Sequence, residues 1–254
     1  MASLGRVEEA ANWSRGLEGS GPDEVIRWAS GQFGRGLVIA SGFGKDGLVV
    51  LDIARRVRPD IPVLFLETGC HFPETLAFRD RLRCEWDLNL VDVRPALSAD
   101  ELEARYGTDL YARDPDRCCA IRKVEPLHRA LNGRTAWMTG LRRSQHAGRQ
   151  GTPVVEWQEL EAGVGLFKVN PLVAWSLEQV EGYLDAHDLP RHPLWARGYS
   201  SVGCAPCTSP VAPGEGERAG RWRGRGKLEC GIHSLTAGHP PSSTWPPPSA
   251  PEGS

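Results

Sequence analysis

The stretch GLVIASGFGKDGLVVLDIARRV, residues 36–57, constrains the fold more than any other part of the sequence. Leu37 to Ala40 form a continuous apolar run, which is typical of a strand buried on both faces of a parallel sheet. A glycine-rich turn follows at once, and residues 48–53 then carry a mixed apolar stripe at helical spacing. The order strand, tight turn, helix predicts the first unit of an α/β domain.

The same alternation continues along the chain. Further strands are predicted at residues 61–68, 88–94 and 135–140, and helices at 72–86, 118–133 and 175–188. We expect Pro126 to bend the second of these helices and Ser176 to cap the start of the third. Strands that alternate with helices predict a largely parallel sheet with right-handed crossovers.

Composition excludes several classes of function. Lys and Arg number 30 against 32 for Asp and Glu, and this balance argues against a protein that binds nucleic acid. No stretch approaches the roughly 20 apolar residues of a membrane span, and the start has no apolar core of the signal-peptide type. We therefore expect a soluble cytoplasmic protein. The Pro/Ser-rich tail, residues 234–254, is predicted to be disordered.

The turn SGFGKDG, residues 41–47, predicts an anion site. Its backbone N–H groups converge at the start of a helix, whose dipole favours negative charge. The turn is not a Walker loop and is closer to the Ser-Gly-Gly-x-Asp-Ser loop of the ATP pyrophosphatase group. Phe43 and Gly47 depart from that loop, which argues against ATP cleavage but leaves a pocket for an adenine nucleotide.

Four of the seven cysteines form two pairs. Cys118 and Cys119 are adjacent, and Cys204 and Cys207 form a Cys-x-x-Cys motif far downstream. Four thiolates complete either a zinc site or a [4Fe–4S] cluster. Adjacent cysteines would strain a single tetrahedral zinc, whereas the separate irons of a cluster accept neighbouring thiolates, so a cluster is favoured. A vicinal disulfide in the first pair or a thioredoxin-like second pair would each explain one pair only.

The remaining thiols differ in their surroundings. Cys230 lies in KLECGIH, residues 227–233, where cationic neighbours favour the reactive thiolate and Glu229 opposes it. It is a candidate nucleophile on a mobile segment. Two other cysteines stand in ordinary segments and are interpreted as small buried residues: Cys70 and Cys84. Basic residues suited to capture phosphate or sulfate are Arg122, Lys123, Arg142, Arg143, Arg149, Arg218 and Arg221.

Taken together, these motifs resemble the thioredoxin-dependent sulfonucleotide reductases, in particular the cluster-containing adenylyl-sulfate (APS) reductases. The matching pieces, in the order of the family, are SGFGKDG, FLETGCHFPET, CCAIRKVEPL, WMTGLRRSQ, KVNPLVAW, HPLWARGYSSVGCAPCTSPV, ERAGRWRG and KLECGIH. They cover roughly residues 36–233. Members that use 3′-phosphoadenylyl sulfate (PAPS) mostly lack the two cysteine pairs, so the pairs favour APS.

The resemblance implies a parallel-sheet, adenine nucleotide alpha hydrolase-like (PP-loop) fold with a flexible C-terminal segment. It implies one [4Fe–4S] cluster per chain, held by Cys118, Cys119, Cys204 and Cys207, and Cys230 as the catalytic nucleophile. The substrate-binding positions it implies are Ser41, Gly42, Phe43, Gly44, Lys45, Asp46, Lys123, Arg142, Arg143, Arg149, Arg218, Arg221 and His233. It also implies thioredoxin as the reductant and a role in assimilatory sulfate reduction, without nucleic acid or membrane partners. Assembly into a homo-oligomer is left open.

The chain divides on this basis into four parts. We expect a helical lead-in at 1–35, the sulfonucleotide-binding domain at 36–211, a mobile segment carrying Cys230 at 212–233, and the tail at 234–254. Three alternatives remain: a PAPS reductase with the same mechanism, a cluster-bearing adenine-nucleotide sensor, and a tRNA sulfurtransferase. The last would need ATP cleavage and a basic RNA face, which Gly47 and the net charge of −2 disfavour.

Overall fold

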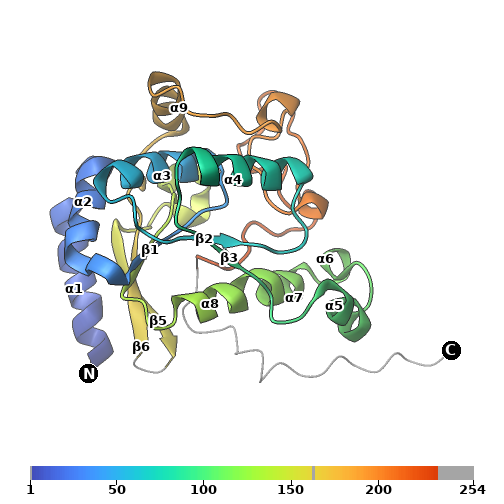
Figure 1. Cartoon of the computed structure of the whole chain (residues 1–254), viewed down its shortest axis with the longest axis horizontal. Helices are drawn as coiled ribbons and strands as arrows, with labels where there is room; N and C mark the ends of the chain where they lie inside the picture. Colours follow the sequence, from blue (N-terminus) through green and yellow to red (C-terminus); the bar gives the residue numbers. More distant parts are fainter. Residues whose placement is uncertain (1, 162–163, 234–254) are drawn as a thin grey trace.

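A twisted, mostly parallel sheet organises the molecule, as the computed structural model shows for the residues it describes, 2–161 and 164–233 (Figure 1). The strand order is β3-β2-β1-β4-β6-β5, in which β5 alone runs antiparallel to its neighbour. The strands are β1 (Leu37–Ala40), β2 (Val63–Leu66), β3 (Leu90–Val93), β4 (Ala136–Met138), β5 (Val155–Glu161) and β6 (Val164–Val169). The predicted α/β class with a largely parallel sheet is confirmed.

Helices cover both faces of this sheet, with α3 and α4 on one face and α8 on the other (Figure 1). The helices are α1 (Ala2–Leu17), α2 (Pro22–Phe33), α3 (Lys45–Val57), α4 (Pro73–Glu85), α5 (Ala99–Tyr106), α6 (Leu110–Arg113), α7 (Pro115–Cys119), α8 (Glu125–Leu131) and α9 (Leu177–Ala186). Helix α1 packs along β5, and α2 and α9 pack on α3. No helix in the described ranges 2–161 and 164–233 combines the length and the apolar character that crossing a membrane requires.

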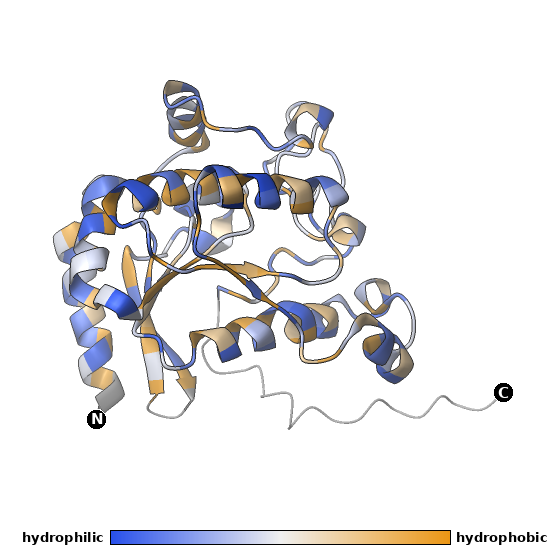
Figure 2. Ribbon diagram, in the orientation of Figure 1, coloured by the Kyte–Doolittle hydropathy of each residue, from blue (hydrophilic) through white to orange (hydrophobic). Residues whose placement is uncertain are grey.

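The apolar run of β1 is buried because consecutive residues face opposite layers. Leu37 and Ile39 join the larger core beneath α2, α3 and α9, and Val38 joins the smaller core beneath α8. Figure 2 shows this as apolar strands enclosed by helices that carry hydrophilic residues. A strand that is buried on both faces fixes the position of the turn that follows it, residues 41–44.

The predicted 118–133 helix is interrupted. Helix α7 gives way at Ala120–Val124 to a π-helical turn before α8 starts. Pro126 has no N–H to donate to the carbonyl four residues earlier, so regular α-helical bonding cannot continue there. Such π turns are frequent at functional sites. The predicted Ser176 cap is present, since its hydroxyl accepts the backbone N–H of Gln179.

The β5–β6 hairpin is not among the strands predicted from the sequence. Residues 212–233 have no strand or α-helix and run as turns across the carboxyl edge of the sheet. The predicted tail, residues 234–254, lies outside the described residues. The chain adds β2 and β3 on one side of β1 and then crosses to add β4 on the other side. The gap between β1 and β4 is therefore a topological switch point, where ligands of open α/β sheets bind.

Candidate active site

A cavity of about 220 Å³ opens at the carboxyl ends of β1, β2 and β4. The turn after β1 forms its floor, and the segment 217–233 forms part of its wall. The residues implied by the resemblance that line it are Ser41, Gly42, Gly44, Lys45, Asp46, Lys123, Arg149, Arg218, Arg221, Cys230 and His233. Three others do not line it: Phe43, Arg142 and Arg143.

The glycine turn is held in shape by its own side chains. Phe43 has a left-handed backbone (φ 56°), which costs a non-glycine residue about 1 kcal/mol or more. Its ring is fully buried against Phe65, and its N–H donates to the Ser41 hydroxyl over 3.1 Å. A Cβ at Gly47 would lie 2.6 Å from the same hydroxyl. Phe43 and Gly47, the two departures from the pyrophosphatase loop, therefore fit each other through Ser41.

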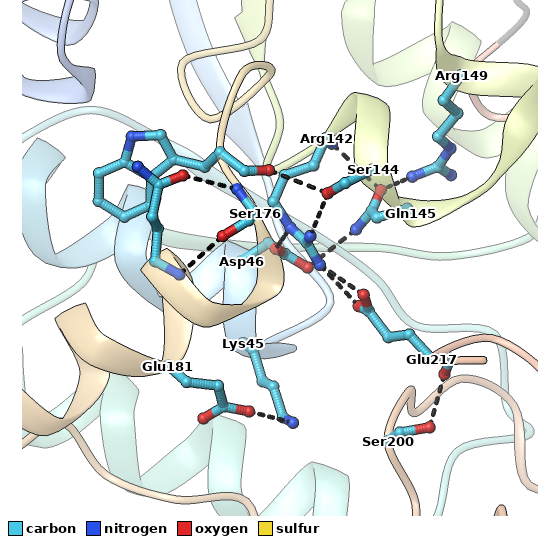
Figure 3. Close-up of polar contacts among 12 residues, drawn as sticks. Lys45, Asp46, Arg142, Ser144, Gln145, Arg149, Ser176, Glu181, Ser200 and Glu217 are labelled. Atoms are coloured by element: carbon cyan, nitrogen blue, oxygen red, sulfur yellow. Dashed lines mark hydrogen bonds and ion pairs between the residues drawn. The ribbon is translucent and has the colours of Figure 1, made fainter. Parts of the chain in front are cut away.

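Arg142 connects two parts of the site through buried ion pairs (Figure 3). Its side chain is fully buried, pairs with Asp46 on α3, and donates to both Glu217 oxygens over 2.9 and 2.7 Å. Burial raises the pKa of Asp46, with the Arg142 charge acting against that rise. This chain of charges ties the first turn of α3 to the C-terminal segment, so Arg142 positions the site from behind the cavity wall.

Two further predicted cations are already paired. Arg143 points away to Glu18 near the end of α1 and donates to the Thr152 carbonyl over 2.8 Å. Lys45 lines the cavity but pairs with Glu181 of α9 over 2.5 Å (Figure 3). The structure therefore does not bring Arg143 into the site, and it gives Lys45 a carboxylate partner there.

Arg149 and Arg218 both line the cavity and share one carboxylate. Glu229 accepts from Arg149 Nε over 2.5 Å and from Arg218 Nη2 over 3.2 Å, and it contacts His146 Nε2 over 2.7 Å. Burial opposes the charge of Glu229, but the two arginines lower its pKa overall. The sequence pattern identified both arginines, whereas Glu229 was noted only as a neighbour of Cys230.

Lys123 and Arg221 are different, because neither has a carboxylate partner among residues 2–161 and 164–233. Lys123 is buried beside the Cys204 thiol, and although burial acts against its charge, the neighbouring thiols raise its pKa. Arg221 donates to the Ser201 hydroxyl and the Val202 carbonyl, both at 3.4 Å, its guanidinium lies 4.7 Å from the centre of the Trp222 ring, and burial lowers its pKa. Among the described residues, two cations without a carboxylate partner therefore face the cavity, which is typical of an anion site.

The four paired cysteines line a second, smaller pocket next to this one. The end of helix α7 supplies Cys118 and Cys119, and the loop that pairs with His71 supplies Cys204 and Cys207. All four are buried free thiols. Burial raises the pKa of Cys118 to about 11 and that of Cys119 to about 12. No three His, Cys, Asp or Glu side chains of the described chain converge closely enough to hold a single metal ion.

Cys70 lines the same small pocket, although its sequence context suggested an ordinary buried residue. Its carbonyl accepts the Ala205 N–H over 2.7 Å, which fixes the Cys-x-x-Cys loop against the end of β2. Thr68, two residues earlier, lies 3.4 Å from Cys204 Sγ. No spacing pattern in the sequence connected residues 68–70 with the cysteine pairs; the link arises only when the loop folds back.

Cys230 is half-buried at the boundary between the two pockets. It lines the larger cavity and packs on the cluster of Cys119, Cys204, Cys207 and Trp222. Three residues on, the His233 ring stacks parallel to Trp137 at 6.1 Å, and its carbonyl accepts from Lys168 Nζ over 3.2 Å. Burial lowers the pKa of His233 well below its ordinary value. The segment is therefore anchored on both sides of the thiol.

The sheet with its glycine turn at the switch point defines an α/β domain of the adenine nucleotide alpha hydrolase-like (PP-loop) class. Residues 36–210 match the phosphoadenosine phosphosulfate reductase domain, and the chain belongs to this family of oxidoreductases that act on sulfur groups. Relatives agree with this. Adenosine 5′-phosphosulfate reductase of Streptomyces coelicolor is 45% identical over 219 residues, 86% of this chain and 91% of that protein.

Another relative is named for the phosphorylated substrate instead. Phosphoadenosine 5′-phosphosulfate reductase of Gloeobacter violaceus is 45% identical over 224 residues, 87% of this chain and 92% of that protein. Among solved structures, a phosphate complex of Candida auris phosphoadenylyl-sulfate reductase superposes with a TM-score of 0.68 at 31% identity, covering 80% of this chain and 97% of that one. Candida glabrata FMN adenylyltransferase shares the fold, with a TM-score of 0.54 at 15% identity over 76% of this chain and 66% of that one.

Proposed function

We propose that the protein reduces APS to sulfite and AMP in assimilatory sulfate reduction, with thioredoxin as the reductant. One observation carries the proposal: Cys230 faces the same cavity as the glycine turn and the cations Lys123 and Arg221, which have no carboxylate partner in the described ranges. A thiol nucleophile, a phosphate cradle and buried positive charge are what transfer of a sulfonyl group from AMP to sulfur requires.

The reaction has two halves that balance. The Cys230 thiolate attacks the sulfur of APS, the bond from that sulfur to the phosphate oxygen breaks, and AMP leaves with the electron pair, giving Cys–S–SO₃⁻. A thioredoxin thiolate then attacks the Cys230 sulfur and sulfite leaves. The second thioredoxin thiol resolves the mixed disulfide and returns the Cys230 thiolate. Two thiols are oxidised to a disulfide, and one sulfate group is reduced to sulfite.

Each part of the cavity suits one part of APS. The backbone of residues 41–44 and the start of α3 suit the phosphate of the AMP half. Lys123 and Arg221 suit the sulfonate, where negative charge moves during attack by Cys230. Because Lys123 is buried and Arg221 is half-buried, each is shielded from water in part and acts more strongly than it would at the surface.

The four paired cysteines fit a [4Fe–4S] cluster as the resident cofactor. They are free, buried, contributed by two segments, and accompanied by the cation Lys123. Each thiolate of such a cluster binds a different iron, so the four sulfurs surround a volume instead of meeting at one ion. When bound, the cluster supplies negative charge and a rigid link between the two cysteine segments. Electrons for the reaction come from thiol exchange.

The test is sulfite release under anaerobic conditions from APS and from PAPS, with thioredoxin, on protein assayed for iron and sulfide. We expect rapid release from APS, about four irons per chain, and no turnover by Cys230→Ser despite retained AMP binding. Full activity of Cys230→Ser would contradict the mechanism. Since relatives carry both the APS and the PAPS name, a preference for PAPS would keep the mechanism and change the substrate.

A further inference from the structure

The cations of the cavity fall into two groups. Lys123 and Arg221 have no carboxylate partner in the described parts of the chain, whereas Arg149 and Arg218 both pair with Glu229. The protein therefore carries its own anion in one half of a site built for anions. That internal anion stands directly before Cys230 in the sequence.

The contacts of Glu229 join two parts of the molecule. Arg149 and His146 lie in the loop after β4, on the body of the domain, while Arg218 and Glu229 belong to the segment 212–233. The carboxylate thus lies within hydrogen-bond reach of three cationic or polar side chains at once. Arg149 is buried, so leaving its charge without a carboxylate or another anion in contact is costly.

We propose that Glu229 occupies, in the ligand-free protein, the place of one anionic group of the nucleotide, and that this contact holds the Cys230 segment closed until a ligand anion replaces it. The class of ligand rests on the proposed function. The carboxylate acts as a positioning residue: it sets where the Cys230 segment lies and competes with the ligand for Arg149 and Arg218.

The size of the cavity agrees with a contact that narrows it. Its volume of about 220 Å³ falls below the roughly 300–1,000 Å³ of sites that enclose drug-sized ligands. Glu229 and Cys230 both line it, so moving this short stretch enlarges the space where the ligand enters.

The experiment compares the parent protein with Glu229→Gln, which keeps the size of the side chain and removes its charge. Glu229→Asp keeps the charge. Glu215→Gln is the matched control, because Glu215 pairs with Arg223 over 2.8 Å in the same segment but does not line the cavity. Two quantities are measured on cluster-replete protein: the dissociation constant of AMP by calorimetry, and the rate of tryptic cleavage after Lys227.

Glu229→Gln should bind AMP about tenfold more tightly, since the internal competitor for two arginines is gone. The same variant should be cleaved after Lys227 several-fold faster without ligand. Glu229→Asp and Glu215→Gln should behave like the parent. A substitution that only damaged the site would speed cleavage after Lys227 and weaken AMP binding. Faster cleavage together with tighter AMP binding is therefore expected only from the proposal.

Unchanged or weaker AMP binding by Glu229→Gln would overturn the inference, and so would unchanged cleavage after Lys227. These results differ from a failure of the proposed function. If the parent protein bound neither AMP nor APS, the function itself would be wrong, whereas AMP binding by the parent with no gain in Glu229→Gln would remove only the role of Glu229.

Discussion

Two arginines near the cavity, the buried Arg142 and the half-buried Arg221, have opposite charge environments. Arg142 pairs with Asp46 and with Glu217, while Arg221 donates to a hydroxyl and a carbonyl at 3.4 Å and lies over the Trp222 ring. Breaking a buried ion pair leaves its partners unpaired and costs about 3–5 kcal/mol, whereas removing an uncompensated charge relieves a desolvation cost. The same residue type therefore stabilises the fold at position 142 and serves ligand binding at position 221.

Arg221→Gln should lower kcat/KM for APS about 100-fold or more, as loss of one electrostatic donor does in other active sites, and should change the free energy of unfolding little. Arg142→Gln should destabilise the fold by about 3 kcal/mol. Steady-state sulfite release and urea unfolding of both variants check this pair. Equal destabilisation by the two substitutions would show that Arg221 is a structural residue.

His192 should make stability depend on pH. It is buried, its Nδ1 accepts the Leu194 N–H over 3.2 Å, and burial lowers its pKa to about 4 from 6.5. Between these two values the unfolded chain binds a proton that the folded protein does not, so the free energy of unfolding falls as pH drops. Urea unfolding from pH 7.5 to 4.5 should show this slope, and His192→Gln should reduce it. Part of the slope should remain in this variant, because burial also lowers the pKa values of His71 and His233.

At the scale of elements, local sequence patterns predicted those features that are determined by residues close together in the chain. The β1 strand, the glycine turn and the Ser176 cap follow from apolar runs and capping chemistry. The β5–β6 hairpin does not, because its residues mix charged and apolar side chains and become strands only by pairing with each other and with β4. The pairing of residues 68–70 with Cys204 and the role of Glu229 likewise depend on long-range contacts.

Gly140, just after β4, sets how closely the sheet approaches the start of α3. A Cβ there would lie 2.7 Å from the Asp46 backbone carbon. Gly140→Ala should therefore push α3 and the glycine turn apart, destabilise the fold by about 1–3 kcal/mol and weaken AMP binding. Chemical unfolding and calorimetry measure the two effects.

Gly182 in α9 is the matched control, because nothing lies within 4 Å of the Cβ it would gain. Gly182→Ala should stabilise the protein by about 0.5–1 kcal/mol, since alanine favours the helix interior, and leave AMP binding unchanged. If Gly140→Ala bound AMP as well as Gly182→Ala, the proposed coupling between β4 and the glycine turn would be wrong.

At the scale of the molecule, the hydrophobic core is large in one region and small in another. The larger core joins the sheet to α2, α3 and α9 and contains most of the buried apolar side chains. The region around α7 and the segment 203–230 rests instead on a small group of three cysteines and Trp222. Two side chains of the segment reach the α6–α7 region: Lys227 pairs with Asp116, and Arg225 donates to the Tyr111 carbonyl over 2.5 Å. Such a region needs a further crosslink to be rigid.

Removing the proposed cluster should therefore loosen this region and leave the rest intact. We expect hydrogen exchange after anaerobic iron chelation to rise at least tenfold in residues 110–124 and 203–230, and to stay unchanged in β1 and α3, because the large core does not involve the cysteines. Cys84→Ser, at an exposed position away from the pocket, serves as a control for thiol loss and should keep both iron content and exchange rates. Exchange that rises evenly over the whole chain would instead mean that the cluster supports the entire fold, and no rise at all would mean that the two cysteine segments hold together by protein contacts alone.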